Sequence, residues 1–223
     1  MKDGLIVLNM KTYEQSTGDG GFKIAKLCDE VAGETKAKLV VCPSADLIYR
    51  ISQDVSIPVY AQHVDNRAFG SNTGRILPEA AKSAGAQGSL VNHSERRLRL
   101  ADIEALIEKL RGLKMTSIVC SNNVATTKAV ATLEPDYVAI EPPELIGSGI
   151  SVSQAQPELI TKSVDAVKEV TDKVKVLTGA GITKGEDIQK ALELGTVGVL
   201  LASGVVKAKD PRMVLLDLIS GLE

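Results

Sequence analysis

The sequence predicts an α/β protein with the architecture of a (β/α)₈ barrel, and three observations support that fold. Eight short apolar runs, rich in β-branched residues, recur about 28 residues apart, which is the size of one strand–helix unit. Helical patterns fill most of the intervals between them. No linker, low-complexity stretch or charge block divides the chain, so residues 1–223 are expected to form a single barrel domain.

The expected strands are the eight apolar runs, namely Leu5–Leu8, Leu39–Val41, Ile57–Ala61, Gly88–Val91, Thr116–Val119, Tyr137–Ile140, Val174–Leu177 and Val197–Leu201. The expected helices include Gly21–Ala32, Asp102–Gly112, Gln156–Thr171, Lys184–Leu194 with a cap at Thr183, and Met213–Ile219 opened by Pro211. The intervals after the second and fifth strands span only about 20 residues, so their helices must be brief. An open doubly wound sheet is the alternative, although that fold more usually has five or six strands.

Composition excludes several classes of function. The chain has 44% hydrophobic residues but no Trp, and its net charge is −2, which argues against nucleic acid or a polyanionic surface as the main partner. The apolar run in Met1–Leu8 is too short for a signal peptide or a membrane span, so we expect a cytoplasmic protein that contacts no membrane. Cys28, Cys42 and Cys120 are odd in number and not closely paired, which predicts reduced thiols rather than disulfides or a structural zinc site.

The segment from Ala139 to Gly149 carries the strongest local signal. The strand at 137–140 ends in Glu141, and two prolines, a short apolar tip and two glycines follow. Prolines stiffen one end of such a loop while glycines free the other, which suits a lid over a carboxylate that acts as a base. Without further context, a helix-starting acid and an ordinary turn explain the segment equally well.

The active site of a (β/α)₈ barrel lies at the carboxyl ends of its strands. Polar side chains follow the first, third, fourth and sixth strands: Asn9, Lys11, His63, His93, Glu95 and Glu141. The seventh and eighth strands end instead in small residues, Gly179, Gly181, Ala202 and Ser203, whose backbone N–H groups can converge on an anion. A phosphorylated small molecule is therefore the expected substrate.

These motifs resemble those of the triosephosphate isomerase family. The resemblance rests on Asn9-x-Lys11, on Asn92–Arg96, on Glu141-Pro142 with Leu145–Gly149, and on the two small-residue loops, and it covers essentially the whole chain. With its shorter length, Pro143-Glu144 after the acid and Thr178 in place of a tyrosine, the chain is similar to the compact archaeal form of the enzyme. The resemblance implies a TIM barrel and an aldose–ketose isomerase that interconverts dihydroxyacetone phosphate and D-glyceraldehyde 3-phosphate through a cis-enediol(ate). This reaction belongs to glycolysis and gluconeogenesis and needs no metal or organic cofactor.

The resemblance also implies a role for each candidate residue. Glu141 is the base, and His93, placed at the start of a helix, is a neutral electrophile of the kind established for this family. Asn9 and Lys11 bind substrate and stabilise developing charge, with Glu95 orienting Lys11. The phosphate contacts fall to Ile146 and Gly147 of a lid spanning Pro142–Gly149, and to Gly179, Gly181, Ala202 and Ser203. His63 has no matching role and is expected to be structural.

A further loop, Phe69–Gly74, matches the loop through which subunits of the family interdigitate. The resemblance implies a homo-oligomer in which the tip near Thr73 reaches Asn9 and Lys11 of a second copy, and the compact form tends to assemble as tetramers. A solvated turn is the alternative and requires no dimer.

Two other classes of protein remain as alternatives. One is another phosphate-binding barrel enzyme, such as an aldolase or a sugar-phosphate isomerase. A metal-dependent aldolase would need more histidines than two, and a Schiff-base aldolase would need a lysine where Glu141 stands. The other is a non-catalytic barrel, which has no reason to keep Asn9, Lys11, His93 and Glu141 together.

Overall fold

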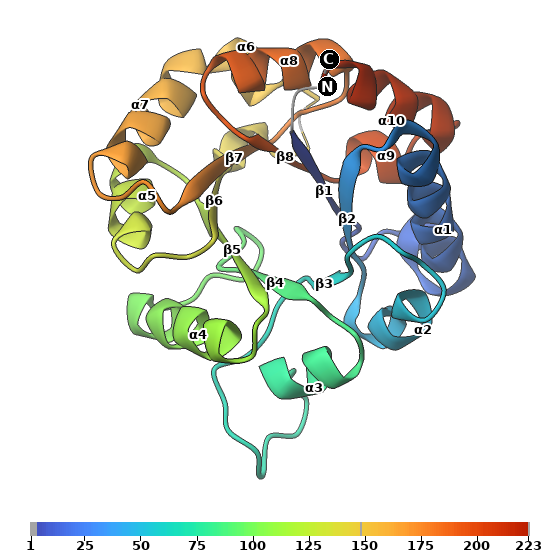
Figure 1. Ribbon diagram of the computed structural model, residues 1–223, viewed down its shortest axis with the longest axis vertical. Helices are drawn as coiled ribbons and strands as arrows, with labels where there is room; N and C mark the ends of the chain where they lie inside the picture. The colour runs from blue at the N-terminus through green and yellow to red at the C-terminus, as the bar shows by residue number, and fades with distance from the viewer. Residues whose placement is uncertain (1–3, 148, 223) are drawn as a thin grey trace.

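A closed ring of eight parallel strands forms the centre of the computed structural model, which describes residues 4–147 and 149–222 (Figure 1). In chain order the strands are β1 (Leu5–Asn9), β2 (Lys38–Cys42), β3 (Tyr60–Ala61), β4 (Gly88–Val91), β5 (Thr116–Ser121), β6 (Tyr137–Ile140), β7 (Lys175–Gly179) and β8 (Gly198–Leu201). Hydrogen-bonded neighbours run β2-β1-β8-β7-β6-β5-β4-β3. A bridge between Val41 and Val59 closes the ring, and the Val41 N–H donates to the Pro58 carbonyl at 3.1 Å. The predicted barrel is confirmed, and the open sheet is wrong.

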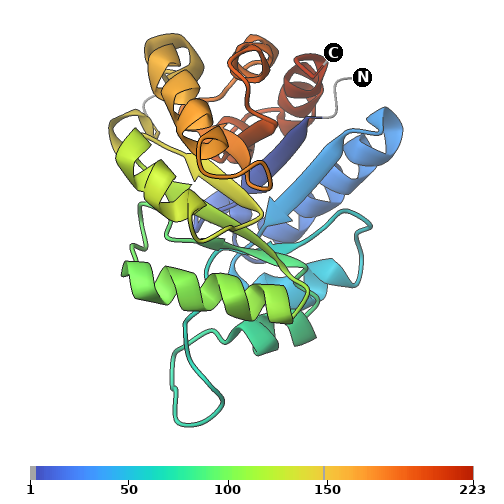
Figure 2. The ribbon, with the colours of Figure 1, turned by 60° about the vertical axis from the view of Figure 1, so that its left-hand side comes forward.

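Helices cover the outside of the ring (Figures 1 and 2). They are α1 (Gly18–Thr35), α2 (Ile48–Ser52), α3 (Pro78–Ser83), α4 (Leu100–Gly112), α5 (Val124–Ala131), α6 (Val152–Ala155), α7 (Pro157–Lys168), α8 (Gly185–Glu193), α9 (Ser203–Val206) and α10 (Pro211–Ser220), with 3₁₀ turns at Glu14–Ser16, Ala45–Leu47 and Pro143–Leu145. The intervals after β2 and β5 hold the short helices α2 and α5, as their lengths predicted.

Side chains along each strand point alternately into the barrel and toward the helices, which divides the core into an interior part and an outer part. In β1, Val7 points into the barrel, whereas Ile6 and Leu8 pack against the surrounding helices, because successive strand residues face opposite sides. The interior is filled by side chains of moderate size: Val7, Val40, Cys42, Tyr60, Leu90, Ile118, Cys120, Ala139, Leu177 and Leu200. The barrel is therefore a packed core, and a ligand can bind only at its ends.

Several predicted boundaries are wrong for identifiable reasons. The strand expected at Ile57–Ala61 shrinks to Tyr60–Ala61, since Pro58 has no N–H to give to a ladder. β7 runs on to Gly179, so the predicted loop glycine lies inside a strand. The helix expected over Gln156–Thr171 begins at Pro157, a residue suited to a first helical position, and ends at Lys168.

Two helix caps were also predicted. Pro211 does open α10, and the Asp210 side chain accepts the Met213 N–H at 3.1 Å. The cap residue of α8 is Lys184 and not Thr183. The reason is Asp187, whose Oδ2 accepts the N–H groups of both Thr183 and Lys184 at 3.0 and 3.1 Å and so draws the preceding loop onto the helix start.

A long loop between β3 and α3 projects away from the barrel (Figures 1 and 2). We call residues 66–75 the arm. Asp65 joins its two ends, because the Asp65 N–H donates to the Ile76 carbonyl at 2.7 Å and its Oδ2 accepts the Ile76 N–H at 2.8 Å. Phe69 near the tip is 77% exposed. None of the helices among the described residues has the length and apolarity needed to cross a membrane.

Candidate active site

Asn9 and Lys11 stand together at the carboxyl end of β1. The Asn9 Oδ1 accepts the Lys11 N–H at 3.1 Å, and Lys11 adopts a left-handed backbone with φ of 50°. Gln62, just after β3, donates to the Lys11 carbonyl at 2.9 Å. The Lys11 ammonium donates to Glu95 Oε1 at 2.8 Å. Backbone and side-chain contacts together thus hold a mostly buried cation over the barrel mouth, and Glu95 lies beside Lys11 as predicted.

His93 presents one ring nitrogen to the mouth. Its Nδ1 accepts the Glu95 N–H at 3.2 Å, so in the neutral ring the proton resides on Nε2. That Nε2 lies 3.5 Å from Glu141 Oε2. The predicted helix at Ser94 is wrong: the chain makes a single turn closed by the Arg96 N–H to the His93 carbonyl, and α4 starts only at Leu100. One local N–H, rather than a helix dipole, therefore fixes the tautomer.

Glu141 is a buried acid with an unused oxygen. It follows β6 directly, is 6% exposed, and its backbone N–H donates to the Ser121 carbonyl at 2.9 Å. Its Oε2 has no hydrogen-bond partner within the residues that the structure describes. Burial raises the pKa of Glu141, and this effect outweighs the lowering by His93, by a hydrogen bond with Cys120 and by Lys11. The result is a carboxylate made more basic than usual, with its buried Oε2 beside His93 Nε2.

Two neighbours of Glu141 were not predicted from the sequence. A Cβ on Gly179 would lie 2.7 Å from Glu141 Oε1 and 2.7 Å from the Leu200 carbonyl, so the absent side chain leaves room for the carboxylate. Gly179 was predicted to lie in a loop and to contact phosphate; it is instead the last residue of β7 and lies against Glu141, while the phosphate contact stays a prediction. Cys120 fills the barrel interior, and burial, together with the nearby Glu141 carboxylate, raises the pKa of its thiol. All three cysteines are free and buried.

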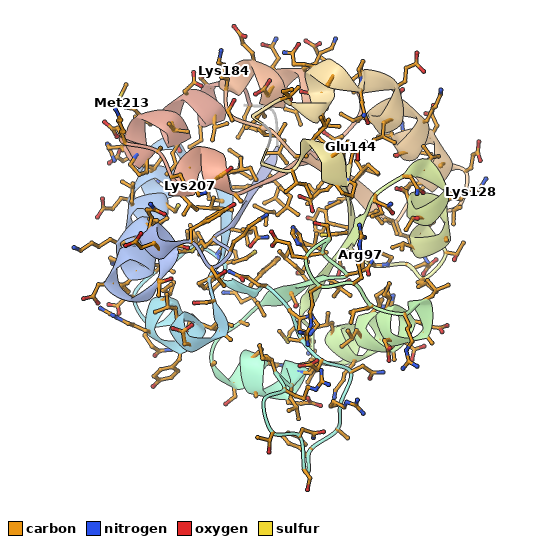
Figure 3. All side chains as sticks on the ribbon, turned by 180° about the vertical axis from the view of Figure 1, so that it is seen from behind. Arg97, Lys128, Glu144, Lys184, Lys207 and Met213 are labelled. Carbon is orange, nitrogen blue, oxygen red and sulfur yellow. The ribbon has the colours of Figure 1, made fainter. Side chains whose placement is uncertain are left out.

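The lid follows Glu141 and closes one side of the mouth (Figure 3, with Glu144 labelled on it). A 3₁₀ turn at Pro143–Leu145 buries Leu145 at 9% exposure, and Gly147 and Gly149 both have left-handed backbones, with φ of 74° and 75°. Ser148 lies outside the described residues. The predicted combination of proline stiffness and glycine freedom is thus present at opposite ends of the segment.

One pocket gathers most of the predicted site. It is lined by Asn9, Lys11, Tyr13, Glu141, the lid residues Ile146, Gly147 and Gly149, and the loops after β7 and β8, which contribute Ala180, Gly181, Ile182, Thr183, Leu200, Leu201, Ala202, Ser203 and Gly204. In α9 the N–H groups of Val205 and Val206 donate to the Ala202 carbonyl at 3.2 and 3.1 Å. Ser203 and Gly204 precede them in the first turn, so their N–H groups have no helical carbonyl to bind. The pocket thus joins charged side chains on one side to backbone N–H groups on the other.

A second cavity adjoins the first and shares Asn9 with it. His93 and Glu95 line it, together with Thr12, Gln62, His63, Asp65, Gly74, Ile76 and Arg96. The His63 Nε2 lies 3.3 Å from Asp65 Oδ1, and burial lowers the pKa of His63. Arg96 also approaches Asp65, at 3.5 Å. Across residues 4–147 and 149–222, no three His, Cys, Asp or Glu side chains are placed to hold a metal ion.

Comparison with known proteins gives a consistent result. Residues 4–222 match the family model described as triosephosphate isomerase. The triosephosphate isomerase of Methanothermus fervidus is 56% identical over 217 residues, 97% of this chain and 97% of that protein. The enzyme of the same name from Methanosarcina barkeri is 55% identical over 96% of both chains, and that of Methanocaldococcus jannaschii is 55% identical over 96% of this chain and 98% of its own.

Proposed function

The chain belongs to the triosephosphate isomerase family, and from this premise we propose a role for each residue at the barrel mouth. The enzyme interconverts dihydroxyacetone phosphate and D-glyceraldehyde 3-phosphate, an aldose–ketose isomerisation of glycolysis and gluconeogenesis. The family membership favours this activity over the two alternatives, another phosphate-binding barrel enzyme such as an aldolase and a non-catalytic barrel.

Glu141 removes the proton from carbon 1 of dihydroxyacetone phosphate and returns it to carbon 2. The observation that carries this role is the buried Oε2, which lies 3.5 Å from His93 Nε2 and has no hydrogen-bond partner among the described residues. A buried carboxylate with a raised pKa is a stronger base than one in water, and a general base works best when its pKa approaches the working pH.

His93 and Lys11 stabilise the enediolate. With Nδ1 occupied by the Glu95 N–H, His93 can donate from Nε2 to the substrate oxygens that enter beside Glu141. The Lys11 ammonium, oriented by Glu95, offsets the negative charge that develops. Asn9 fixes the Lys11 backbone and presents its remaining amide group to the substrate.

The phosphate binds opposite the base, among backbone N–H groups. It lies between Gly147 of the lid, Gly181 of the loop after β7, and Ser203 at the start of α9. All three line the pocket together with Ile146 and Ala202. Closure of the lid on the phosphate excludes water, which otherwise favours loss of phosphate from the enediolate.

A coupled assay that follows conversion of glyceraldehyde 3-phosphate tests the base. Glu141→Asp withdraws the carboxylate by one methylene, so kcat should fall by on the order of 100-fold with little change in KM. Glu158→Asp makes the same change on the exposed surface of α7 and should leave both constants unchanged. Equal kcat values for wild type and Glu141→Asp would contradict the assignment of Glu141 as the base.

We further propose that the chain assembles as a homo-oligomer through its arm. The arm, with Thr73 near its tip, stands away from its own barrel, and the second cavity beside Asn9 and His93 is open to receive the arm of another copy. The exposed Phe69 adds apolar area that association would bury. A tetramer built from such dimers, in the cytoplasm, is the assembly proposed here.

Light scattering coupled to size exclusion measures the assembly. Thr73→Arg places a long charged side chain at the arm tip, so the mass should fall to that of the monomer and activity should fall with it. Thr132→Arg, at the exposed end of α5, changes charge equally and should leave the mass unaltered. A Thr73→Arg protein of unchanged mass would contradict docking through the arm.

A further inference from the structure

The segment after the lid contains a chain of buried hydroxyl groups. We call residues 150–153 the hinge segment. The Ser153 hydroxyl donates to the Asp187 carbonyl at 3.0 Å, and the hydroxyls of Ser151 and Ser153 lie 2.6 Å apart. Because Ser153 has one proton and gives it to Asp187, Ser151 must be the donor in the contact between the two serines. The chain of bonds therefore runs in one direction, from Ser151 through Ser153 to the first turn of α8.

Asp187 also binds the loop after β7, which lines the pocket. We call residues 180–184 the β7 loop. The Asp187 carboxylate accepts the N–H groups of Thr183 and Lys184 at 3.0 and 3.1 Å, and the Val152 N–H donates to the Ala180 carbonyl at 3.2 Å. Gly181 lies directly against the Ile150 carbonyl, with no room for a Cβ. Both ends of the β7 loop are thus bonded, directly or through Asp187, to the hinge segment.

These bonds are shielded from water. Ser153 is completely buried, and Ser151 and Asp187 are 5% and 6% exposed. A buried hydroxyl destabilises a protein unless it is hydrogen-bonded, and a bond kept from water is more rigid than an exposed one. Ser163 of α7 offers a contrast, since it is equally buried but its Oγ has no hydrogen-bond partner among the described residues. Ser153 alone of this pair connects two segments of the active site.

From this geometry we propose that Ser153 is a positioning residue, which through Asp187 makes the hinge segment and the β7 loop move as one unit. The proposal rests on the proposed function, in which the lid and the β7 loop both hold the phosphate. Its consequence is selective: the coupling assists only a substrate whose phosphate engages both segments. Binding energy from a non-reacting group of the substrate can be used in this way to organise the reacting end.

The test compares a phosphorylated substrate with one that lacks phosphate. In Ser153→Ala, kcat/KM for glyceraldehyde 3-phosphate should fall about tenfold, as expected for loss of a buried hydrogen bond that acts in the transition state. The much smaller kcat/KM for glyceraldehyde should stay unchanged, because Glu141 and His93 are undisturbed. Ser163→Ala removes an equally buried hydroxyl from α7 and should change neither value. Proton exchange at carbon 2, followed by NMR in D₂O, measures the slow reaction of glyceraldehyde.

A merely structural role predicts a different result. Equal losses of kcat/KM with both substrates would mean that Ser153→Ala disturbs the whole site. No loss with either substrate would mean that the bond from Ser153 to Asp187 does not contribute to catalysis. Both outcomes overturn the proposal. Ser151→Ala keeps the bond from Ser153 to Asp187 and should lower only the glyceraldehyde 3-phosphate value, by about threefold. It serves as the second test if Ser153→Ala does not fold. Failure of wild type to isomerise glyceraldehyde 3-phosphate would instead refute the proposed function.

Discussion

The two halves of the barrel mouth are built in different ways. The half formed by β4 and β6 carries its chemistry in side chains, His93 and Glu141, each placed at a strand end and nearly buried. The half formed by β7 and β8 offers mostly small residues, and the groups proposed to bind phosphate there are backbone N–H groups. Ala180 and Gly181 there have left-handed backbones, with φ of 75° and 70°. In the mechanism proposed above, proton transfer depends on residue identity, while phosphate binding depends on backbone conformation.

This difference predicts how each half responds to substitution. On the side-chain half, removal of one functional group should abolish a chemical step and leave binding nearly intact. On the backbone half, substitutions act only by displacing segments, so their effects should be smaller and should appear in the response to the phosphate.

The largest effect is expected on the side-chain half, for His93→Gln. Loss of a positioned proton donor costs about 10²- to 10⁴-fold in kcat, with a much smaller change in KM. His63→Gln is the matched control, because His63 also follows a strand but contacts Asp65 and not Glu141. Steady-state kinetics of both variants measure this. Equal losses of activity would contradict a special role for His93.

A glycine on the boundary between the halves should behave as part of the side-chain half. The Cβ introduced by Gly179→Ala meets Glu141 Oε1 at 2.7 Å, so the carboxylate must move. A displacement of about 1 Å can cost on the order of 100-fold in rate, and we expect the loss in kcat rather than in KM. Gly33→Ala, at an open position of α1, should have no effect on either constant. If Gly179→Ala raised KM alone, Gly179 would belong with the phosphate contacts.

The smallest effect concerns stability and follows from the pKa of Glu141. Burial raises this pKa above its ordinary value, so the contribution of the group to stability is present at low pH and is lost as pH rises through the folded-state value. At pH 7 the ionised carboxylate is therefore destabilising, and Glu141→Gln should raise Tm by roughly 2–4 °C while abolishing activity. The gain should be smaller at pH 4, because protonation removes the buried charge from the wild type. Thermal unfolding at both pH values checks this, and a lower Tm at pH 7 would contradict it.

The sequence predicted the side-chain half well, for a physical reason. Strands repeat at the spacing of a strand–helix unit, and parallel strands bring their carboxyl ends to one rim, so Lys11, His93 and Glu141 had to converge. The contact from Lys11 to Glu95 was expected from the resemblance and is present at 2.8 Å.

The remainder could not be predicted because it depends on three-dimensional packing. Nothing local distinguishes Gly179, which gives room to Glu141, from a glycine that starts a loop. Cys120 reads as an ordinary interior residue of β5 until the fold places its thiol beside Glu141. The bond from Ser153 to Asp187 joins residues 34 positions apart, beyond any local pattern. The turn after His93 has polar residues that suit a helix start equally well.

The central claim is that Glu141 abstracts a proton from carbon 1 of the substrate. ¹H NMR of dihydroxyacetone phosphate incubated with the protein in D₂O measures this step directly, because an abstracted proton exchanges with solvent before it returns. We predict that wild type replaces one carbon 1 hydrogen by deuterium and that Glu141→Gln, which has no basic oxygen, does not. Exchange by Glu141→Gln at the wild-type rate would contradict the account.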